Sequence, residues 1–333
     1  MTSPGRIARV AVGLPVVRRS IDRLAARDRG TPDLLAVLTY HRVDEPSDQL
    51  HPGLISATPR AFEEQVAWLA RSYRVVSLAD VVQRQAGGPA LPRRSVLLTF
   101  DDGYRDFADH AWPALLRLGV PATLFVPTAF PGDPGRAFWW DRLHRAMSRP
   151  ALPESVDTPL GRLELATPAA RTAASRRIRT RLKSMPHDRA MAAVDEITAL
   201  LGGDAPRRSV LDWDELRALV SAGLEVGAHT RTHPLLDRIP EAELDAEIGG
   251  SRLDLERELG HAPVAIAYPN GNHSAEVRAA TAAAGFTVAF TTRRGTNDLR
   301  AVDWLALRRV NVGGASDRTV LAAQLHRWFQ HWP

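Results

Sequence analysis

The chain has 333 residues, of which 44% are hydrophobic and 24% are charged, as in folded globular proteins. Cysteine is absent, which excludes disulfides, thiolate metal sites and a cysteine nucleophile. The formal net charge is +5, but 38 acidic residues are mixed among 43 basic ones, so we expect no nucleic-acid partner.

Residues 1–33 are predicted to form a basic helical segment ahead of the main domain. Arginines surround a short apolar run at 10–17, and Gly13 and Pro15 interrupt that run. Because no clear signal peptide and no stretch of about 18 apolar residues occurs, we expect a surface helix and a cytoplasmic location, with export left open. Peripheral contact with anionic lipid through this basic segment is the alternative.

From residue 34 onwards, apolar runs alternate with helix-like segments. Several of the runs are continuously apolar, which favours parallel strands that are covered on both faces. The predicted strands are Leu34–His41, Ser95–Asp101, Pro121–Pro127, Gly223–His229, Pro263–Pro269, Phe286–Thr292 and Leu305–Val312. The predicted helices between them are Pro59–Arg71, Phe107–Leu118, Trp213–Ala222, Glu241–Leu259 and Ala275–Ala284.

Residues 136–210 interrupt this alternation, since they contain no convincing strand. Helices are predicted there at Phe138–Met147 and Ala170–Leu201, and the arginines of the second helix are interpreted as a solvated face. Of Trp139 and Trp140, one is expected to pack the insertion onto the main domain. The fold class is therefore α/β: one domain over residues 34–333 with repeated β–α units and a helical insertion at about 136–210.

Unusual polar residues follow several predicted strands, where the functional residues of parallel α/β barrels gather. His229 and His233 are four residues apart, which would place both rings on one face of a helical turn, close enough to share a metal. Asp101 and Asp102 follow an apolar strand, where adjacent carboxylates are costly without a cation. The alternative for either aspartate is the N-cap of the next helix.

The sequence Thr-Phe-Asp-Asp-Gly-Tyr at 99–104 and the downstream His-Thr-x-x-His-Pro at 229–234 together resemble the polysaccharide deacetylase family, carbohydrate esterase family 4, with its NodB homology domain. The resemblance covers about residues 34–312 and implies a distorted (β/α)7 barrel. The Tyr-Pro-x-Gly stretch at 268–271 is similar to the branch that includes poly-N-acetylglucosamine deacetylases.

This resemblance implies that Asp101 is the general base and that Asp102, His229 and His233 bind a divalent metal. Zinc is the expected ion, with cobalt, nickel or manganese as alternatives. A backbone N–H near Tyr104 would bind the oxyanion. The third motif, Tyr268, Pro269, Asn270 and Gly271, would line the substrate site.

Two residues of the family pattern are missing, and other residues would have to take their roles. The third motif lacks its usual arginine, and Arg309 near the last strand is our candidate to orient the base. The late Leu-x-His is also missing, so His41 at the first strand end is our candidate acid for the leaving amine, ahead of His273. His41 could instead orient Asp101 or the metal ligands.

The sequence therefore predicts a metal-dependent hydrolase that acts on carbon–nitrogen bonds other than peptide bonds. It would remove N-acetyl or related acyl groups from an amino sugar or polysaccharide. Two alternatives stay open: a deacylase or deformylase of a small or lipid-linked sugar intermediate, and a carbohydrate-binding barrel that has lost catalysis.

Overall fold

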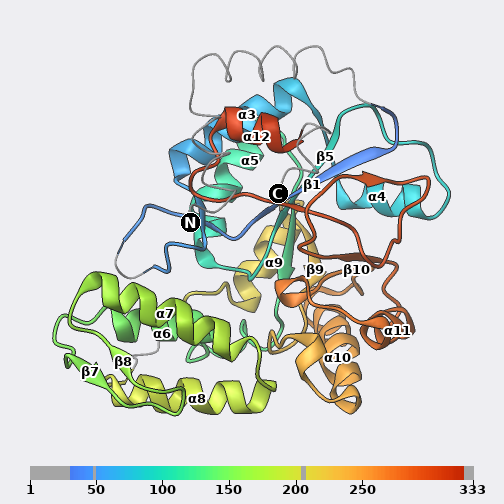
Figure 1. Ribbon diagram of the computed structural model, residues 1–333. Coiled ribbons are helices and arrows are strands. Elements are labelled where there is room, and N and C mark those ends of the chain that lie inside the picture. Colours follow the sequence, from blue (N-terminus) through green and yellow to red (C-terminus); the bar gives the residue numbers. More distant parts are fainter. Residues whose placement is uncertain (1–30, 48–49, 204–207, 326–333) are drawn as a thin grey trace.

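The computed structural model describes residues 31–47, 50–203 and 208–325, and a nine-stranded sheet with surrounding helices forms its centre (Figure 1). The strands follow the order β11-β10-β9-β6-β5-β1, and all neighbours on this path are parallel. The strands of the sheet are β1 (Leu34–Tyr40), β4 (Arg74–Val76), β5 (Ser95–Phe100), β6 (Thr123–Val126), β9 (Glu225–Ala228), β10 (Ala265–Ala267), β11 (Val288–Phe290), β12 (Asn297–Asp298) and β13 (Val310–Asn311).

The segment around β13 connects the two ends of this path. The Leu307 N–H donates to Ala289 O of β11 (2.9 Å), and the Val312 N–H donates to Thr39 O of β1 (2.9 Å). The predicted seventh strand is therefore split into a single bridge at Leu307 and the short β13. The expectation of a distorted (β/α)7 barrel is confirmed.

The strands on the path from β11 to β1 bury both of their faces, because alternate side chains enter two different hydrophobic clusters. In β1, Leu35 and Val37 pack inside the barrel with Leu97 of β5 and with Leu307, whereas Leu38 packs toward the outer helices. Asp101 and Arg309 are two residues beyond Thr99 and Leu307 on the inward-facing register. The alternation therefore places the Asp101 carboxylate and the Arg309 guanidinium at the same end of the barrel interior.

The helices around the barrel begin and end at residues with clear capping chemistry. Ser77 and Asp212 each form a capping box, and Gly119 (φ 62°) and Gly260 (φ 79°) end their helices in the left-handed conformation. The helices are α3 (Pro59–Ser72), α4 (Leu78–Gln85), η1 (Phe107–Ala111), α5 (Trp112–Leu118), α9 (Trp213–Ser221), η2 (Leu236–Arg238), α10 (Glu241–Leu259), η3 (Pro269–Gly271), α11 (Ala275–Ala283) and α12 (Arg318–Leu325). A separate small sheet pairs β2 (Arg42–Val43) with β3 (Ile55–Ala57).

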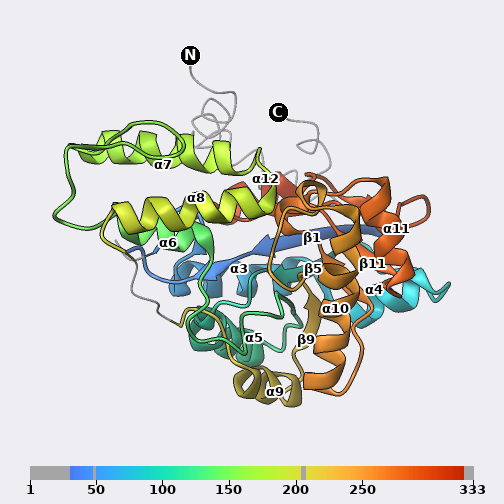
Figure 2. The same ribbon diagram turned by 90° about the horizontal axis from the view of Figure 1, so that it is seen from below.

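The insertion lies beside the barrel and has a hydrophobic cluster of its own (Figure 2). It contains α6 (Trp139–Met147), β7 (Ser155–Val156), β8 (Leu163–Glu164), α7 (Pro168–Leu182) and α8 (His187–Leu200). The helical insertion is confirmed, but two details of the prediction are wrong. The helix expected at 170–201 is two helices, because Pro186 lacks an N–H and disfavours helical backbone at Met185. The β7–β8 hairpin was missed because its strands have only two residues each.

The predicted basic segment at 1–33 lies almost entirely outside the described residues. Within the part of the chain that the structure describes, no helix combines the length and the apolar character needed to cross a membrane.

Candidate active site

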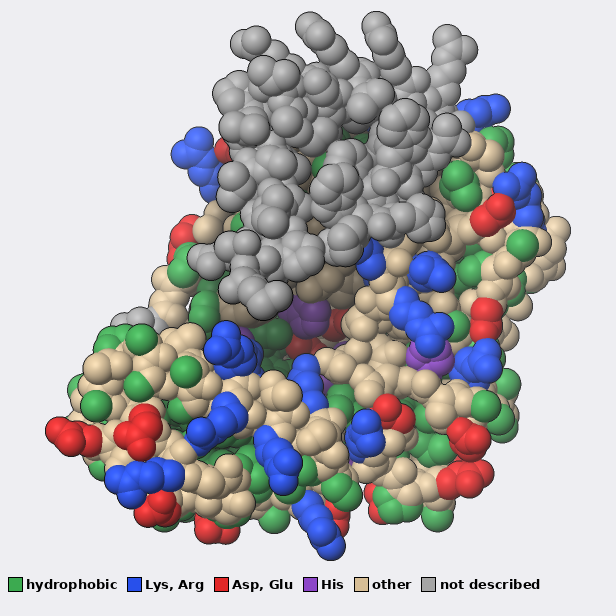
Figure 3. Space-filling view, viewed as in Figure 1, with side chains coloured by type: hydrophobic (Ala, Val, Ile, Leu, Met, Phe, Trp, Pro, Cys, Tyr) green, Lys and Arg blue, Asp and Glu red, His purple; other side chains and the backbone are tan. Residues whose placement is uncertain are grey.

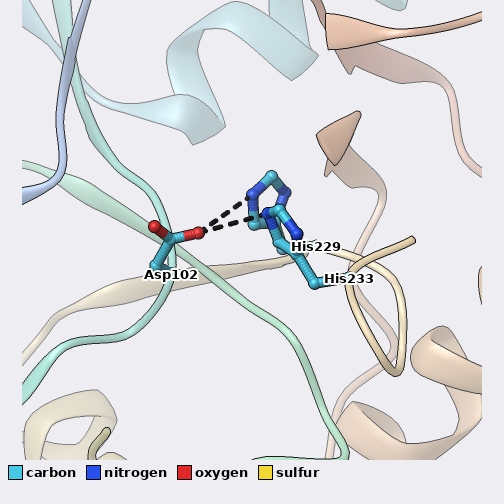
Figure 4. Close-up of side chains that lie close together, drawn as sticks. All are labelled: Asp102, His229 and His233. Carbon is cyan, nitrogen blue, oxygen red and sulfur yellow. Dashed lines mark ion pairs between the residues drawn. The ribbon is translucent and has the colours of Figure 1, made fainter. Parts of the chain in front are cut away.

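Asp102, His229 and His233 lie together at the carboxyl end of the barrel strands, with their side chains directed at one another (Figure 4). The Asp102 Oδ1 atom is 3.5 Å from His229 Nε2 and 3.3 Å from His233 Nε2. One ligand atom from each residue lies within 4.8 Å of the other two. Asp102 and His229 are each 2% exposed, so three polar groups meet where little water reaches them.

This donor set fits a divalent metal ion. Asp102 Oδ1 is buried and accepts no hydrogen bond, which is costly for a carboxylate oxygen unless a cation is present. For ligand bonds of 2.0–2.1 Å, neighbouring ligands of a tetrahedral ion are about 3.3 Å apart, which is close to the two separations seen here. Two imidazoles and one carboxylate also leave a fourth position for water or substrate, as in catalytic zinc sites.

The two histidines reach this position from a loop and not from a helical turn, so that expectation was wrong. After β9, Thr230 (φ 64°) and His233 (φ 62°) have left-handed backbone, and Thr230 Oγ1 accepts a hydrogen bond from the His233 N–H (3.1 Å). His229 Nδ1 lies 2.6 Å from Ala267 O of β10. This contact assigns the proton to Nδ1 and leaves Nε2 free to bind a metal.

Acidic residues of α10 hold the histidine loop in place. Glu247 accepts hydrogen bonds from the N–H groups of Arg231 and Thr232 (3.0 and 2.9 Å). Asp254 binds the Arg231 guanidinium through both oxygens (2.7 and 3.0 Å) and also accepts from Thr128 Oγ1. Paired charges therefore support a loop whose backbone is strained at two positions.

Asp102 has the unusual backbone angle φ 76° and is followed by Gly103 at φ 66°, so the chain turns sharply at the end of β5. Neither carboxylate caps a helix, because the next helix begins only at Phe107. Burial alone would raise the pKa of Asp102, but His229 and His233 hold it well below its usual value. In His233 burial dominates and lowers the pKa, which favours the neutral ring that metal binding requires.

Asp101 is bound by Arg309 through two parallel hydrogen bonds, Nη1 to Oδ1 (2.8 Å) and Nη2 to Oδ2 (2.7 Å). Arg309 Nε donates to Thr291 O, which fixes the plane of the guanidinium. Both side chains are buried. Although burial opposes the charged form, Arg309 and then His229 keep the pKa of Asp101 below its ordinary value. The structure therefore places Arg309 on Asp101, the aspartate that the arginine missing from the third motif was expected to orient.

His41, Asp101, Asp102, His229 and His233 line one cavity of about 430 Å³ between the barrel and the insertion. In the space-filling view, histidine and acidic side chains are visible in the hollow between these two parts (Figure 3). The charge of His41 acts on both aspartates and lowers their pKa values, although burial has the largest effect on each. The structure therefore places His41 beside the predicted base and the predicted metal ligands.

The Tyr104 side chain connects this centre to the insertion. Its hydroxyl donates to Asp141 Oδ2 (2.9 Å) and accepts from Trp140 Nε1 (2.9 Å). The Arg42 guanidinium lies over its ring, 4.3 Å from the centroid. Burial raises the pKa of Asp141 to about 6. Trp140 also contacts the edge of the His233 ring, so it packs the insertion against the histidine loop.

Only one residue of the third motif lines the cavity, and that residue is Asn270. Tyr268 instead points into the barrel wall, where its hydroxyl donates to Leu305 O and its ring stacks on His273. Pro269 is buried, and Gly271 (φ 75°) is so close to Thr292 that a Cβ would lie 2.3 Å from its backbone nitrogen. These three residues shape the turn that presents Asn270, which itself has φ 54°.

The sequence favoured a lid or a side subdomain for the insertion, but it did not identify the insertion residues that line this cavity. Arg179 of α7 and Lys183, which directly follows α7, line it together with His51 and His187. The arginine-rich character of α7 was visible in the sequence, but its interpretation as a wholly solvated face is wrong for Arg179. The tertiary position of α7 decides which of its arginines face the cavity, and the sequence does not carry that information.

Comparison with known families matches residues 88–157 and 168–289, more than half of the chain, to the polysaccharide deacetylase family model. Over 87 residues the chain is 39% identical to the poly-beta-1,6-N-acetyl-D-glucosamine N-deacetylase of Escherichia coli K12, which covers 26% of this chain and 12% of the relative. Over 103 residues it is 34% identical to the Staphylococcus epidermidis protein of the same name, which covers 27% and 35%. The matches therefore span only a minor part of either relative.

Solved structures show the same fold over most of the chain. The Streptococcus pyogenes deacetylase PplD in complex with acetate superposes with a TM-score of 0.61 at 19% identity, over 89% of this chain and 100% of that one. IcaB from Ammonifex degensii gives a TM-score of 0.57 at 23% identity, over 88% and 97%. At these identities the likeness establishes the fold.

Proposed function

Since the chain belongs to the polysaccharide deacetylase family, whose members generally use a divalent metal, we propose that it is a hydrolase that removes N-acetyl or related acyl groups from an amino sugar or polysaccharide. The observation that carries this proposal is the position of an Arg309-bound carboxylate, Asp101, in the same cavity as the Asp102, His229 and His233 donor set. A base beside an open metal site is what hydrolysis of an amide by water requires.

In this proposal Asp102, His229 and His233 hold the metal, with zinc as the expected ion and cobalt, nickel or manganese as alternatives. A bound divalent ion would polarise the acyl carbonyl and lower the pKa of a bound water to about 7. The carbonyl of Ala267 fixes the ring orientation of His229 from behind.

Asp101 is assigned as the general base that takes a proton from the attacking water. The two hydrogen bonds from Arg309 keep it ionised and fix both carboxylate oxygens. His41 is assigned as the acid that gives a proton to the leaving amine as the carbon–nitrogen bond breaks, and a backbone N–H near Tyr104 as a donor to the oxyanion. The products are a carboxylic acid, acetate for an acetyl group, and a free amino sugar.

A carbohydrate-binding barrel without catalysis is the alternative, and the geometry disfavours it. The missing third-motif arginine and the missing late histidine were the reasons to consider loss of activity, and the two hydrogen bonds from Arg309 to Asp101 support Arg309 as the substitute for the arginine. A binding site for neutral sugar has no need of a buried arginine–aspartate pair next to two histidines, because burying such groups is costly.

The test is acetate release from N-acetylglucosamine and its oligomers by the purified chain. We expect release with the bound or added metal, loss of release after chelation, and recovery when zinc is returned. Release that survives complete metal removal would contradict the proposed reaction.

A further inference from the structure

Two cationic side chains of the insertion line the cavity on the side opposite the barrel strands. Arg179 and Lys183 are four residues apart at the carboxyl end of α7, and both line the cavity that contains Asp101 and Asp102. In Figure 3, Lys and Arg side chains surround the hollow on the side of the insertion.

These two cations have no carboxylate partner. Among the described residues, none of the acidic side chains is within ion-pair distance of either Arg179 or Lys183, whereas Arg42, Arg231 and Arg309 are each paired with an aspartate. Of the acidic residues that the structure describes, Asp101 and Asp102 alone line the cavity. Arg309 already compensates Asp101, and the metal site accounts for Asp102.

The hydrogen bonding of Arg179 is also incomplete. Its Nε atom is buried and has no partner, and its Nη1 contacts the Nε2 atom of His51. His51 Nδ1 accepts a hydrogen bond from the Gly53 N–H (3.0 Å), so in the neutral ring the proton is on Nε2, which then cannot accept one from Arg179. Burial, and then the charge of Arg179, lowers the pKa of His51 to about 4, so the ring is neutral.

Lys183 is held over the same opening by the third motif. Its ammonium donates to Asn270 Oδ1 (2.6 Å), a neutral acceptor, and two further N–H groups remain for a ligand. The Lys183 side chain is exposed at the rim of the cavity, and the protein atoms around it, followed by the nearby charge of Arg179, lower its pKa. Two like charges are thus held close together at a cavity wall, which is unfavourable unless an anion joins them.

The other arginines of the same helix show that this arrangement is not a general property of α7. Arg176 and Arg181 are exposed and line a shallow depression on a different face of the helix. The negative end of the helix dipole favours cations near residue 183, but it does not account for the direction of the Arg179 side chain into the cavity.

We propose that Arg179 and Lys183 bind a phosphate or carboxylate group of the substrate, so that this chain acts on an anionic N-acylated sugar. The inference rests on the proposed function, since it specifies the substrate of that site. A neutral N-acetylglucosamine polymer offers no group to compensate these cations, and its deacetylated product carries ammonium groups that they repel. An anion next to the acylated sugar compensates both charges through charge-assisted hydrogen bonds.

The experiment compares dissociation constants of three sugars with the metal-loaded full chain carrying Asp101→Asn, which slows turnover so that binding can be measured. The sugars are N-acetylglucosamine 1-phosphate, N-acetylmuramic acid, which carries a carboxylate, and the uncharged methyl glycoside of N-acetylglucosamine. We expect at least one anionic sugar to bind about tenfold or more tightly than the glycoside, with a preference that falls as salt is raised.

Adding Arg179→Gln and Lys183→Gln should bring the ratio of charged to uncharged affinity close to one. The matched control with Arg176→Gln and Arg181→Gln removes the same charge from the exposed face and should keep the ratio. Equal affinities in the parent protein would overturn the proposal. So would a preference that survives Arg179→Gln and Lys183→Gln, because the metal, or Arg309 without its carboxylate partner, would then bind the anion.

Acetate release by the wild-type chain separates this inference from the proposed function. Release without any anion preference would leave the deacetylase assignment intact and remove the anion site. An anion preference that depends on Arg179 and Lys183, without acetate release from any of the sugars, would keep the anion site and remove the deacetylase assignment.

Discussion

The strand ends of the barrel and the inner face of the insertion both supply charged side chains to one cavity. They differ in whether each charge has a partner of opposite charge. At the strand ends, Asp101 is paired with Arg309, and Asp102 faces two histidines. On the insertion, Arg179 and Lys183 face the same space without a carboxylate. A paired charge holds a side chain in a fixed geometry, as a reaction requires. A charge without a partner of opposite sign is available to bind an ionic ligand.

The largest effect is expected at Asp101, on the barrel side of this comparison. Asp101→Asn keeps the shape of the side chain but removes the proton acceptor, so turnover should fall about 10³- to 10⁴-fold. Metal content should stay at the wild-type level, because Asp101 is not among the proposed ligands. Substantial residual turnover in a metal-loaded variant would show that another group is the base.

Arg309→Met tests whether the pairing keeps Asp101 ionised. Arg309 holds the pKa of Asp101 below its ordinary value against burial, so its stabilisation is present above the unfolded pKa and is lost as pH falls through the folded one. Without Arg309, burial raises that pKa, and the acid limb of the pH–rate profile should move to higher pH.

The same variant should lower the free energy of unfolding at neutral pH by about 3–5 kcal/mol, as for other buried ion pairs that lose one partner. Arg308→Met is the matched control, because Arg308 is the exposed neighbour on the same segment. If both variants give the parental pH profile, Arg309 does not control the ionisation of Asp101.

His41→Ala tests the acid that we assign to the leaving amine. Turnover of an N-acetyl sugar should fall about 100-fold, because an amine leaves poorly without a proton. An activated aryl acetate has a leaving group that needs no proton, so its hydrolysis should be almost unaffected. If turnover of both substrates falls equally, His41 instead orients Asp101 or the metal ligands.

The smallest effect is expected at the support of the histidine loop. Asp254→Asn weakens the contact with Arg231 and should reduce metal affinity about tenfold without abolishing it, as for other residues that orient metal ligands. Asp245→Asn, on the exposed side of α10, is the matched control. Unchanged metal affinity in Asp254→Asn would show that the loop holds its shape without this pair.

The sequence was informative where local pattern decides the structure. Apolar runs located seven of the nine strands of the sheet but not the short β4 and β12, and the residues directly after the predicted strands, such as Asp101 and His229, are found at the expected barrel end. The conformation of the histidine loop was not predictable, since the loop with left-handed backbone at Thr230 and His233 is held by contacts with α10, such as that from Arg231 to Glu247, 16 residues further along the chain.

Two further features depended on long-range packing. The partnership of Arg309 with Asp101 joins positions 208 residues apart and follows from barrel closure, so the sequence could offer Arg309 only as a candidate. The helices of the insertion were recognised, but the side of α7 that faces the cavity was not, because α7 has no strongly amphipathic pattern.

The most direct test of the central claim is the metal content of the purified chain beside that of Asp102→Ala. Our account predicts about one divalent ion per chain in the wild type and its loss in a variant that stays folded, because two histidines alone do not complete a site with three protein ligands. A wild-type chain that binds no metal after zinc is supplied, or an Asp102→Ala variant that binds it equally well, would contradict the account.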